Sequence, residues 1–171
     1  MGTAQFLCSG SLGSGNALWD VSGSSVHPAY QGEKMKIEDA VAKMGAKKVY
    51  LMLGMNDVAV YGADGSVNNM KKLLANIKAA SPGVSICVQS ATPMIRDSYK
   101  GLSNELLYDY DVKLAAMCAQ NGYSFIDVAS VMRDESGRLP ASYCSDPDGM
   151  GLHFTDAACE VWIEYLCTHT V

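Results

Sequence analysis

Apolar residues in this chain follow two patterns: short unbroken runs, and longer stretches in which they recur every three or four positions. The unbroken runs leave no polar face, which predicts strands covered on both sides, as in a parallel sheet between helices. The predicted strands span residues 4–8, 47–53, 84–90 and 124–128. The recurring pattern predicts helices over 33–45, 66–80 and 103–120, with Ser103 as a cap, and a final helix that Thr155 caps.

Strands that alternate with helices of this length predict βαβ units, and hence an α/β fold: a three-layer α/β/α sandwich with a parallel sheet. The 171 residues contain no internal repeat and no proline-rich linker, so residues 1–171 are predicted to form a single domain. Ligands of such sheets bind beyond the carboxyl ends of the strands. The loops expected to line a pocket are therefore 55–65, 91–104 and 133–152.

The composition excludes several classes of protein. Apolar residues make up 49% of the chain and charged residues 18%, which is typical of a folded globular protein. The net charge of −5 and the lack of a basic cluster argue against nucleic acid as a partner. No apolar run approaches the roughly 20 residues that span a bilayer. The six cysteines form no CxxC pair, so no metal site is expected.

The N-terminus lacks the basic and apolar segments of a signal peptide. We therefore expect a cytoplasmic protein by default, and a secreted or cell-envelope protein if an upstream segment exists. The sequence predicts no particular oligomeric state.

The strand at 47–53 ends in an unusual way, with the tetrapeptide GMND. Gly54 allows the backbone to turn where a side chain would clash, and Asn56 and Asp57 have side chains that hydrogen-bond nearby backbone in turns. A simple turn would explain these residues. Their place at the carboxyl end of a strand is also the place where chemistry is expected.

One histidine stands out among the three in the chain. His153 lies in the segment YCSDPDGMGLHFTDAA, after two aspartates and directly before the last predicted helix. A histidine acts as a base when an acceptor fixes one ring N–H, and either Asp146 or Asp148 is near enough in sequence to supply that acceptor. The alternative is a turn rich in Asp, Pro and Gly that happens to contain a histidine.

Together, the GMND strand end and the Asp…His loop before the last helix resemble the SGNH (GDSL-type) hydrolases, whose fold is flavodoxin-like. The resemblance implies that Asn56 donates to the oxyanion, with Gly54 beside it, and that His153 is the general base. It also implies that the two side chains converge at one end of the sheet. The family's last block is D-x-x-H, but residue 150 is Met, so the triad acid is Asp146 or Asp148 across a longer loop. Asp57 is expected to order the loop through backbone hydrogen bonds.

The family's first block, G-D-S, is absent from this chain. The nearest string is Ser9-Gly10-Ser11-Leu12, which would make Ser11 the nucleophile. In the other alignment residues 4–10 are the family's second strand, Gly10 or Gly13 is the oxyanion glycine, and the GDS strand lies upstream of this chain. We favour the second alignment, because the segment after Ser11 offers no second strand. The chain is then truncated at its N-terminus and is expected to be nearly inactive on a short-chain ester.

The resemblance implies a serine esterase or acylhydrolase that acts on short acyl esters, such as acetyl esters, of carbohydrates, cell-wall glycans or lipids. It implies no cofactor. The alternative function is a non-catalytic ligand-binding or interaction module on the same fold. A flavodoxin-like cofactor binder is disfavoured, because no G-x-G-x-x-G loop opens a helix here.

Overall fold

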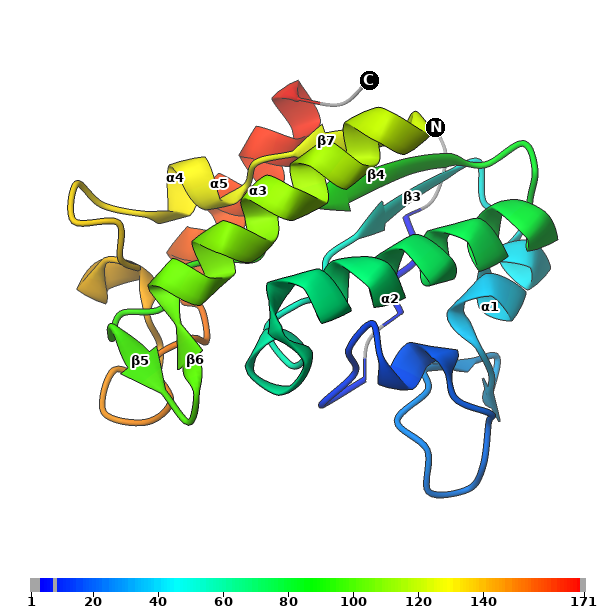
Figure 1. Ribbon diagram of the computed structural model, residues 1–171, viewed down its shortest axis with the longest axis horizontal. Coiled ribbons are helices and arrows are strands. Elements are labelled where there is room, and N and C mark those ends of the chain that lie inside the picture. Colours follow the sequence, from blue (N-terminus) through cyan, green and yellow to red (C-terminus); the bar gives the residue numbers. More distant parts are fainter. Residues whose placement is uncertain (1–3, 8, 170–171) are drawn as a thin grey trace.

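The computed structural model describes residues 4–7 and 9–169, and at its centre lies a three-stranded parallel sheet (Figure 1). Its strands are β3 (Lys48–Leu51), β4 (Ser85–Gln89) and β7 (Ser124–Ile126), in the order β3-β4-β7. Val49 pairs with Ile86, and Val88 pairs with Phe125, both in parallel register. The parallel sheet predicted from the unbroken apolar runs is thus confirmed for three of the four runs, each strand being shorter than predicted.

The prediction of a first strand at residues 4–8 is wrong for residues 4–7, and residue 8 lies outside the described residues. Residues 4–6 are exposed, and Phe6 has 89% of its surface in contact with solvent. An apolar run becomes a strand only when its backbone pairs with a neighbouring strand. Residues 4–7 pair with no strand in the described part of the chain.

Helices lie on both faces of the sheet (Figure 1). One face is covered by α2 (Val58–Ala80) and α3 (Asn104–Asn121), with α1 (Ile37–Met44) packed against α2, while α5 (Asp156–Thr168) lies across the other face. The main core fills the space between α2, α3 and the sheet, where Met70, Leu74, Val88 and Leu114 have no exposed surface. The layers are those that the alternating patterns predict.

The predicted caps of the last two long helices are confirmed. The hydroxyl of Ser103 accepts a hydrogen bond from the backbone N–H of Leu106 at the start of α3, and that of Thr155 accepts from Ala158 at the start of α5. The other helix boundaries differ from the prediction. Residues 33–34 belong to a strand rather than to α1, and α2 begins eight residues early because it continues through a break at Gly62.

The remaining elements are short. They are η1 (Asn16–Leu18), β1 (Ala29–Tyr30), β2 (Glu33–Lys34), β5 (Ser98–Tyr99), β6 (Leu102–Ser103), α4 (Ala129–Met132) and η2 (Ala141–Tyr143). Two antiparallel hairpins, β1–β2 and β5–β6, stand outside the central sheet. Among the described residues, no helix is long and apolar enough to cross a membrane.

Candidate active site

The GMND segment leaves the sheet directly after β3, and its glycine is fixed by two constraints. Gly54 has a φ of 144°, a backbone conformation that favours glycine. A Cβ at Gly54 would also lie 2.6 Å from a ring carbon of Tyr110, whose hydroxyl donates a hydrogen bond to the carbonyl of Leu53 at 3.0 Å. The ring of Tyr110 therefore leaves room only for glycine at position 54. The backbone conformation of Gly54 sets the direction of residues 55–57.

Asn56 is exposed at the end of this turn. Its Nδ2 donates one hydrogen bond, at 3.0 Å, to the backbone carbonyl of Leu12. Since an amide nitrogen carries two hydrogens, the second N–H remains without a partner among the described residues. Asn56 lines a cavity of about 230 Å³ together with Ser9, Leu12 and Gly54. The amide is thus anchored on one side and open to a small ligand on the other.

Asp57 orders the loop of residues 11–15, which lies close to the end of β3. Its side chain is buried and accepts hydrogen bonds from the backbone N–H groups of Ser14, at 2.5 Å, and Gly15, at 3.0 Å. Gly13 packs so closely that a Cβ would lie 2.3 Å from a carboxylate oxygen of Asp57. The expected ordering role of Asp57 is confirmed by these contacts.

The loop also carries the candidate nucleophile. Ser11 is exposed and has a φ of 61°, which is unusual for a residue other than glycine, and Gly10 is exposed beside it. Asn16 braces the loop by donating to the carbonyl of Ser11 and accepting from the N–H of Gly13, both at 2.8 Å. Nothing in the sequence marks Asn16 as a site residue, because an asparagine after glycine is ordinary in a turn.

Asp146 is the hydrogen-bonded partner of His153. Its Oδ2 lies 2.8 Å from Nδ1 of the histidine ring. The same carboxylate accepts the backbone N–H groups of Met150, Gly151, Leu152 and His153 at 3.0–3.2 Å. His153 lies seven positions after Asp146, compared with three in the D-x-x-H block, and the longer loop closes around the carboxylate of Asp146.

The hydrogen bonds decide the charge of this aspartate. Partial burial raises the pKa of Asp146, but the N–H and ring of His153 and the N–H of Gly151 outweigh it and hold the pKa well below its usual range. An ionised carboxylate can only accept, so Nδ1 of the ring carries the proton and Nε2 has a free lone pair while the ring is neutral. Asp148 is exposed and, in the described structure, makes no hydrogen bond with His153.

The loop from Asp146 to His153, here called the histidine loop, is hydrogen-bonded to the loop that follows β4. The N–H of Ile95 donates to the carbonyl of Gly151, and the guanidinium of Arg96 donates to the carbonyl of Pro147, both at 2.9 Å. Because β3 and β4 are adjacent and parallel, the GMND segment and the loop that holds the histidine loop leave the sheet at the same edge. The described contacts do not join Ser11 to His153, and the convergence of Asn56 with His153 stays a prediction.

No group of three or more His, Cys, Asp or Glu side chains in the described residues is arranged to hold a metal ion. The arrangement instead offers a base held by a carboxylate and an amide with an open N–H. These are the groups that general base catalysis and oxyanion stabilisation require.

The sequence of this chain matches the model of the GDSL-like lipase/acylhydrolase family over residues 12–161. Among curated proteins, none matches the chain.

Three solved structures with the same fold are described as an esterase or a lipase. A GDSL-like lipase from Bacteroides thetaiotaomicron is 17% identical, with a TM-score of 0.62 over 77% of this chain and 65% of that one. The native aryl esterase of M. smegmatis is 17% identical, with a TM-score of 0.61 over 77% and 64%. A carbohydrate esterase family 3 protein from Talaromyces cellulolyticus is 18% identical, with a TM-score of 0.60 over 77% and 60%. The matched region thus spans 60–65% of the length of these three structures.

Proposed function

The chain belongs to the GDSL-like lipase/acylhydrolase family, and on this basis we propose that it is a serine esterase domain for short acyl esters. The acyl group would be acetyl or similarly short, carried on a carbohydrate, a cell-wall glycan or a lipid. The observation that carries the proposal is the hydrogen bond between Asp146 and Nδ1 of His153.

In the proposed reaction His153 is the general base. Asp146 fixes the ring with its proton on Nδ1, so that Nε2 takes the proton of the attacking serine hydroxyl. The serine oxygen then attacks the ester carbonyl carbon, and the histidine returns the proton to the leaving alcohol. A water molecule, activated in the same way, releases the acid and restores the serine.

Asn56 is the proposed oxyanion donor. The bond to the Leu12 carbonyl holds the amide in one orientation, and the remaining N–H would donate to the negative oxygen of the tetrahedral intermediate. A donor that is already oriented needs no reorganisation when the charge develops. Gly54 lines the same cavity as this amide, and the backbone around Gly10 is proposed to bound that space as well.

The proposal includes two sources of the attacking serine, and the assay below distinguishes them. Ser11 is adjacent to Leu12, whose carbonyl accepts the hydrogen bond from Asn56. Ser11 is exposed, and its backbone has an unusual conformation. The other source is a GDS serine outside residues 1–171. The lack of a described hydrogen bond between Ser11 and His153 favours the second source, and equally favours a non-catalytic binding module on the same fold.

The proposal is tested by hydrolysis of p-nitrophenyl acetate, measured on this chain and on any longer reading frame that contains it. His153→Ala should lower kcat by roughly 10³-fold or more, and Asn56→Ala by roughly 10²–10³-fold. The matched controls are His169→Ala and Asn68→Ala, both at exposed positions. They should leave the rate unchanged.

The same assay identifies which serine is the nucleophile. If the present chain is active and Ser11→Ala abolishes the reaction, Ser11 is the nucleophile. If only a longer protein is active, its additional serine is the nucleophile. A lack of ester hydrolysis in both forms, or an active protein whose rate survives His153→Ala, would contradict the proposed activity.

A further inference from the structure

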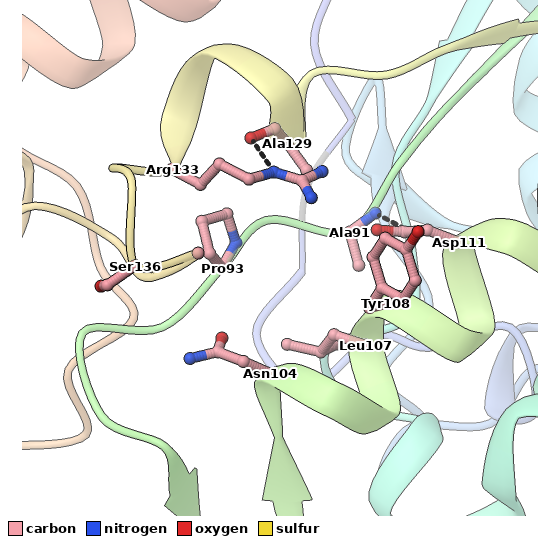
Figure 2. Close-up of a pocket in the computed structure, with 10 residues that line it drawn as sticks. Ala91, Pro93, Asn104, Leu107, Tyr108, Asp111, Ala129, Arg133 and Ser136 are labelled. Carbon is pink, nitrogen blue, oxygen red and sulfur yellow. Dashed lines mark hydrogen bonds between the residues drawn. The ribbon is translucent and has the colours of Figure 1, made fainter.

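A second cleft lies beyond the carboxyl ends of β4 and β7, apart from the residues of the candidate active site (Figure 2). Its volume is about 230 Å³. The loop after β4 forms one wall, α3 forms another, and the end of α4 with the turn that follows closes the third side. At about 30 Å³ of liquid volume per water molecule, the space equals roughly seven or eight waters. This is about the room that one small ring needs.

Asp111 is the buried polar group of the cleft. Its Oδ1 accepts the backbone N–H of Ala91 at 2.7 Å, and Oδ2 makes no hydrogen bond within the described structure. The burial of this carboxyl raises its pKa to about 7; the Ala91 N–H lowers the pKa, Asp127 raises it and Arg133 lowers it. One carboxylate oxygen is therefore available to a ligand at the base of the cleft.

Arg133 supplies a donor on the opposite wall. Its Nε donates to the carbonyl of Ala129 at 2.9 Å, and one terminal nitrogen pairs with Asp127 at 3.4 Å. The other terminal nitrogen, Nη1, has no partner among the described residues, which leaves two N–H groups for a ligand. Figure 2 shows the guanidinium and the carboxyl of Asp111 both directed into the cleft.

Most of the remaining lining is apolar, with Asn104 and Ser136 as its other polar residues. Pro93 and Leu107 face the cleft, and the ring of Tyr108, 60% exposed, stands at its edge (Figure 2). Mostly apolar walls with a few directed polar groups are typical of a small-molecule site. An exposed aromatic ring at the edge offers a flat apolar surface against which the C–H face of a ring can pack.

The charges select the class of ligand. A cation attracted to ionised Asp111 would be repelled by Arg133, and an anion attracted to Arg133 would be repelled by ionised Asp111. A neutral group with neighbouring hydroxyls avoids both repulsions, because one hydroxyl can donate to Asp111 while another accepts from Arg133. We propose that this cleft binds a neutral, hydroxyl-bearing ring of about the size of one monosaccharide, with Tyr108 packed against the ring.

The test is a titration of the ¹⁵N-labelled 171-residue chain with methyl β-D-glucopyranoside, followed by the amide shifts of Ala91 and Ala129. Saturable shifts with a millimolar Kd are expected. Tyr108→Ala should raise Kd about threefold or more. The positional control is Val112→Ala, one helical turn further on; Val112 is exposed and does not line the cleft, and its removal should leave Kd unchanged.

The role of the Asp111 carboxyl is tested by the pH dependence of Kd. Above about pH 7 Asp111→Asn should raise Kd about tenfold, because the amide presents N–H donors where the carboxylate accepts. Below about pH 6 the difference should disappear, because the protonated acid then donates as the amide does. The exposed neighbour substitution Asp109→Asn should change neither value.

Three results would overturn the inference. The first is no saturable shift up to roughly 100 mM glycoside, a concentration well above a millimolar Kd. The second is a Kd that Tyr108→Ala and Asp111→Asn leave unchanged. The third is binding of sodium acetate or butylamine at these amides in place of the glycoside, which would assign the cleft to a charged ligand. None of these readouts depends on ester hydrolysis, so the inference stands or falls separately from the proposed esterase.

Discussion

The buried carboxyl of Asp111 should make the stability of the fold depend on pH in an unusual direction. Burial raises the pKa of this group from 3.8 to about 7. Between these values the folded state binds more protons than the unfolded state, so the free energy of unfolding falls as pH rises. At about 1.4 kcal/mol per pH unit, the full contribution is about 4 kcal/mol, lost between about pH 4 and pH 7.

The substitution Asp111→Asn isolates this contribution. Asparagine keeps an oxygen that can accept the Ala91 N–H, which the aspartate accepts at 2.7 Å, but it carries no charge at any pH. We expect the variant to gain stability relative to the wild type by about 1.4 kcal/mol per pH unit from about pH 4 to about pH 7, and the difference to stay constant above that. The measurement is urea unfolding by tryptophan fluorescence at several pH values.

The control variant is Asp109→Asn, at an exposed position two residues earlier on α3. Its difference from the wild type should not vary with pH in this window. A flat difference for Asp111→Asn would refute the reasoning, because it would mean that the carboxyl ionises as readily in the folded as in the unfolded chain.

Three further substitutions test individual contacts. Gly13→Ala should lower the free energy of unfolding by about 1–3 kcal/mol in urea denaturation, because its Cβ would meet the carboxylate of Asp57 at 2.3 Å; unchanged stability would contradict that packing. Asp146→Ala should speed hydrogen exchange of amides 150–153 about tenfold or more, the equivalent of about one lost hydrogen bond, and equal protection would contradict the loop geometry. Trp162→Phe should cost about 1–3 kcal/mol in thermal unfolding, because it leaves buried Gln89 without its 2.7 Å donor; a change below about 0.5 kcal/mol would count against that bond.

The parts of the fold that the sequence predicts well are those with a local signal. The runs that became β3, β4 and β7 are apolar on both faces, and the caps at Ser103 and Thr155 act within three residues of themselves. Residues 4–8 carry the same local signal, yet residues 4–7 do not form a strand, because pairing depends on a neighbour elsewhere in the chain. Local pattern alone cannot supply that neighbour.

The same contrast between local and long-range contacts holds for the functional residues. His153 and its acceptor lie within one loop, so the sequence narrows the partner to Asp146 or Asp148, and the closure of the loop around one carboxylate selects Asp146. Asp111 gave no such signal. On a helix an aspartate usually faces water, and its burial here depends on the N–H of Ala91, 20 residues away. Long-range contacts of this kind leave no pattern in the sequence.

One short segment joins the second cleft to the histidine loop. The amide of Asn104, which lines the cleft, accepts the N–H of Met94 and donates to the carbonyls of Met94 and Arg96 at 2.8–3.0 Å. Between them, the N–H of Ile95 holds the carbonyl of Gly151 in the histidine loop. One wall of the cleft, at Asn104, and the loop that carries the base of the proposed reaction are therefore both hydrogen-bonded to residues 94–96.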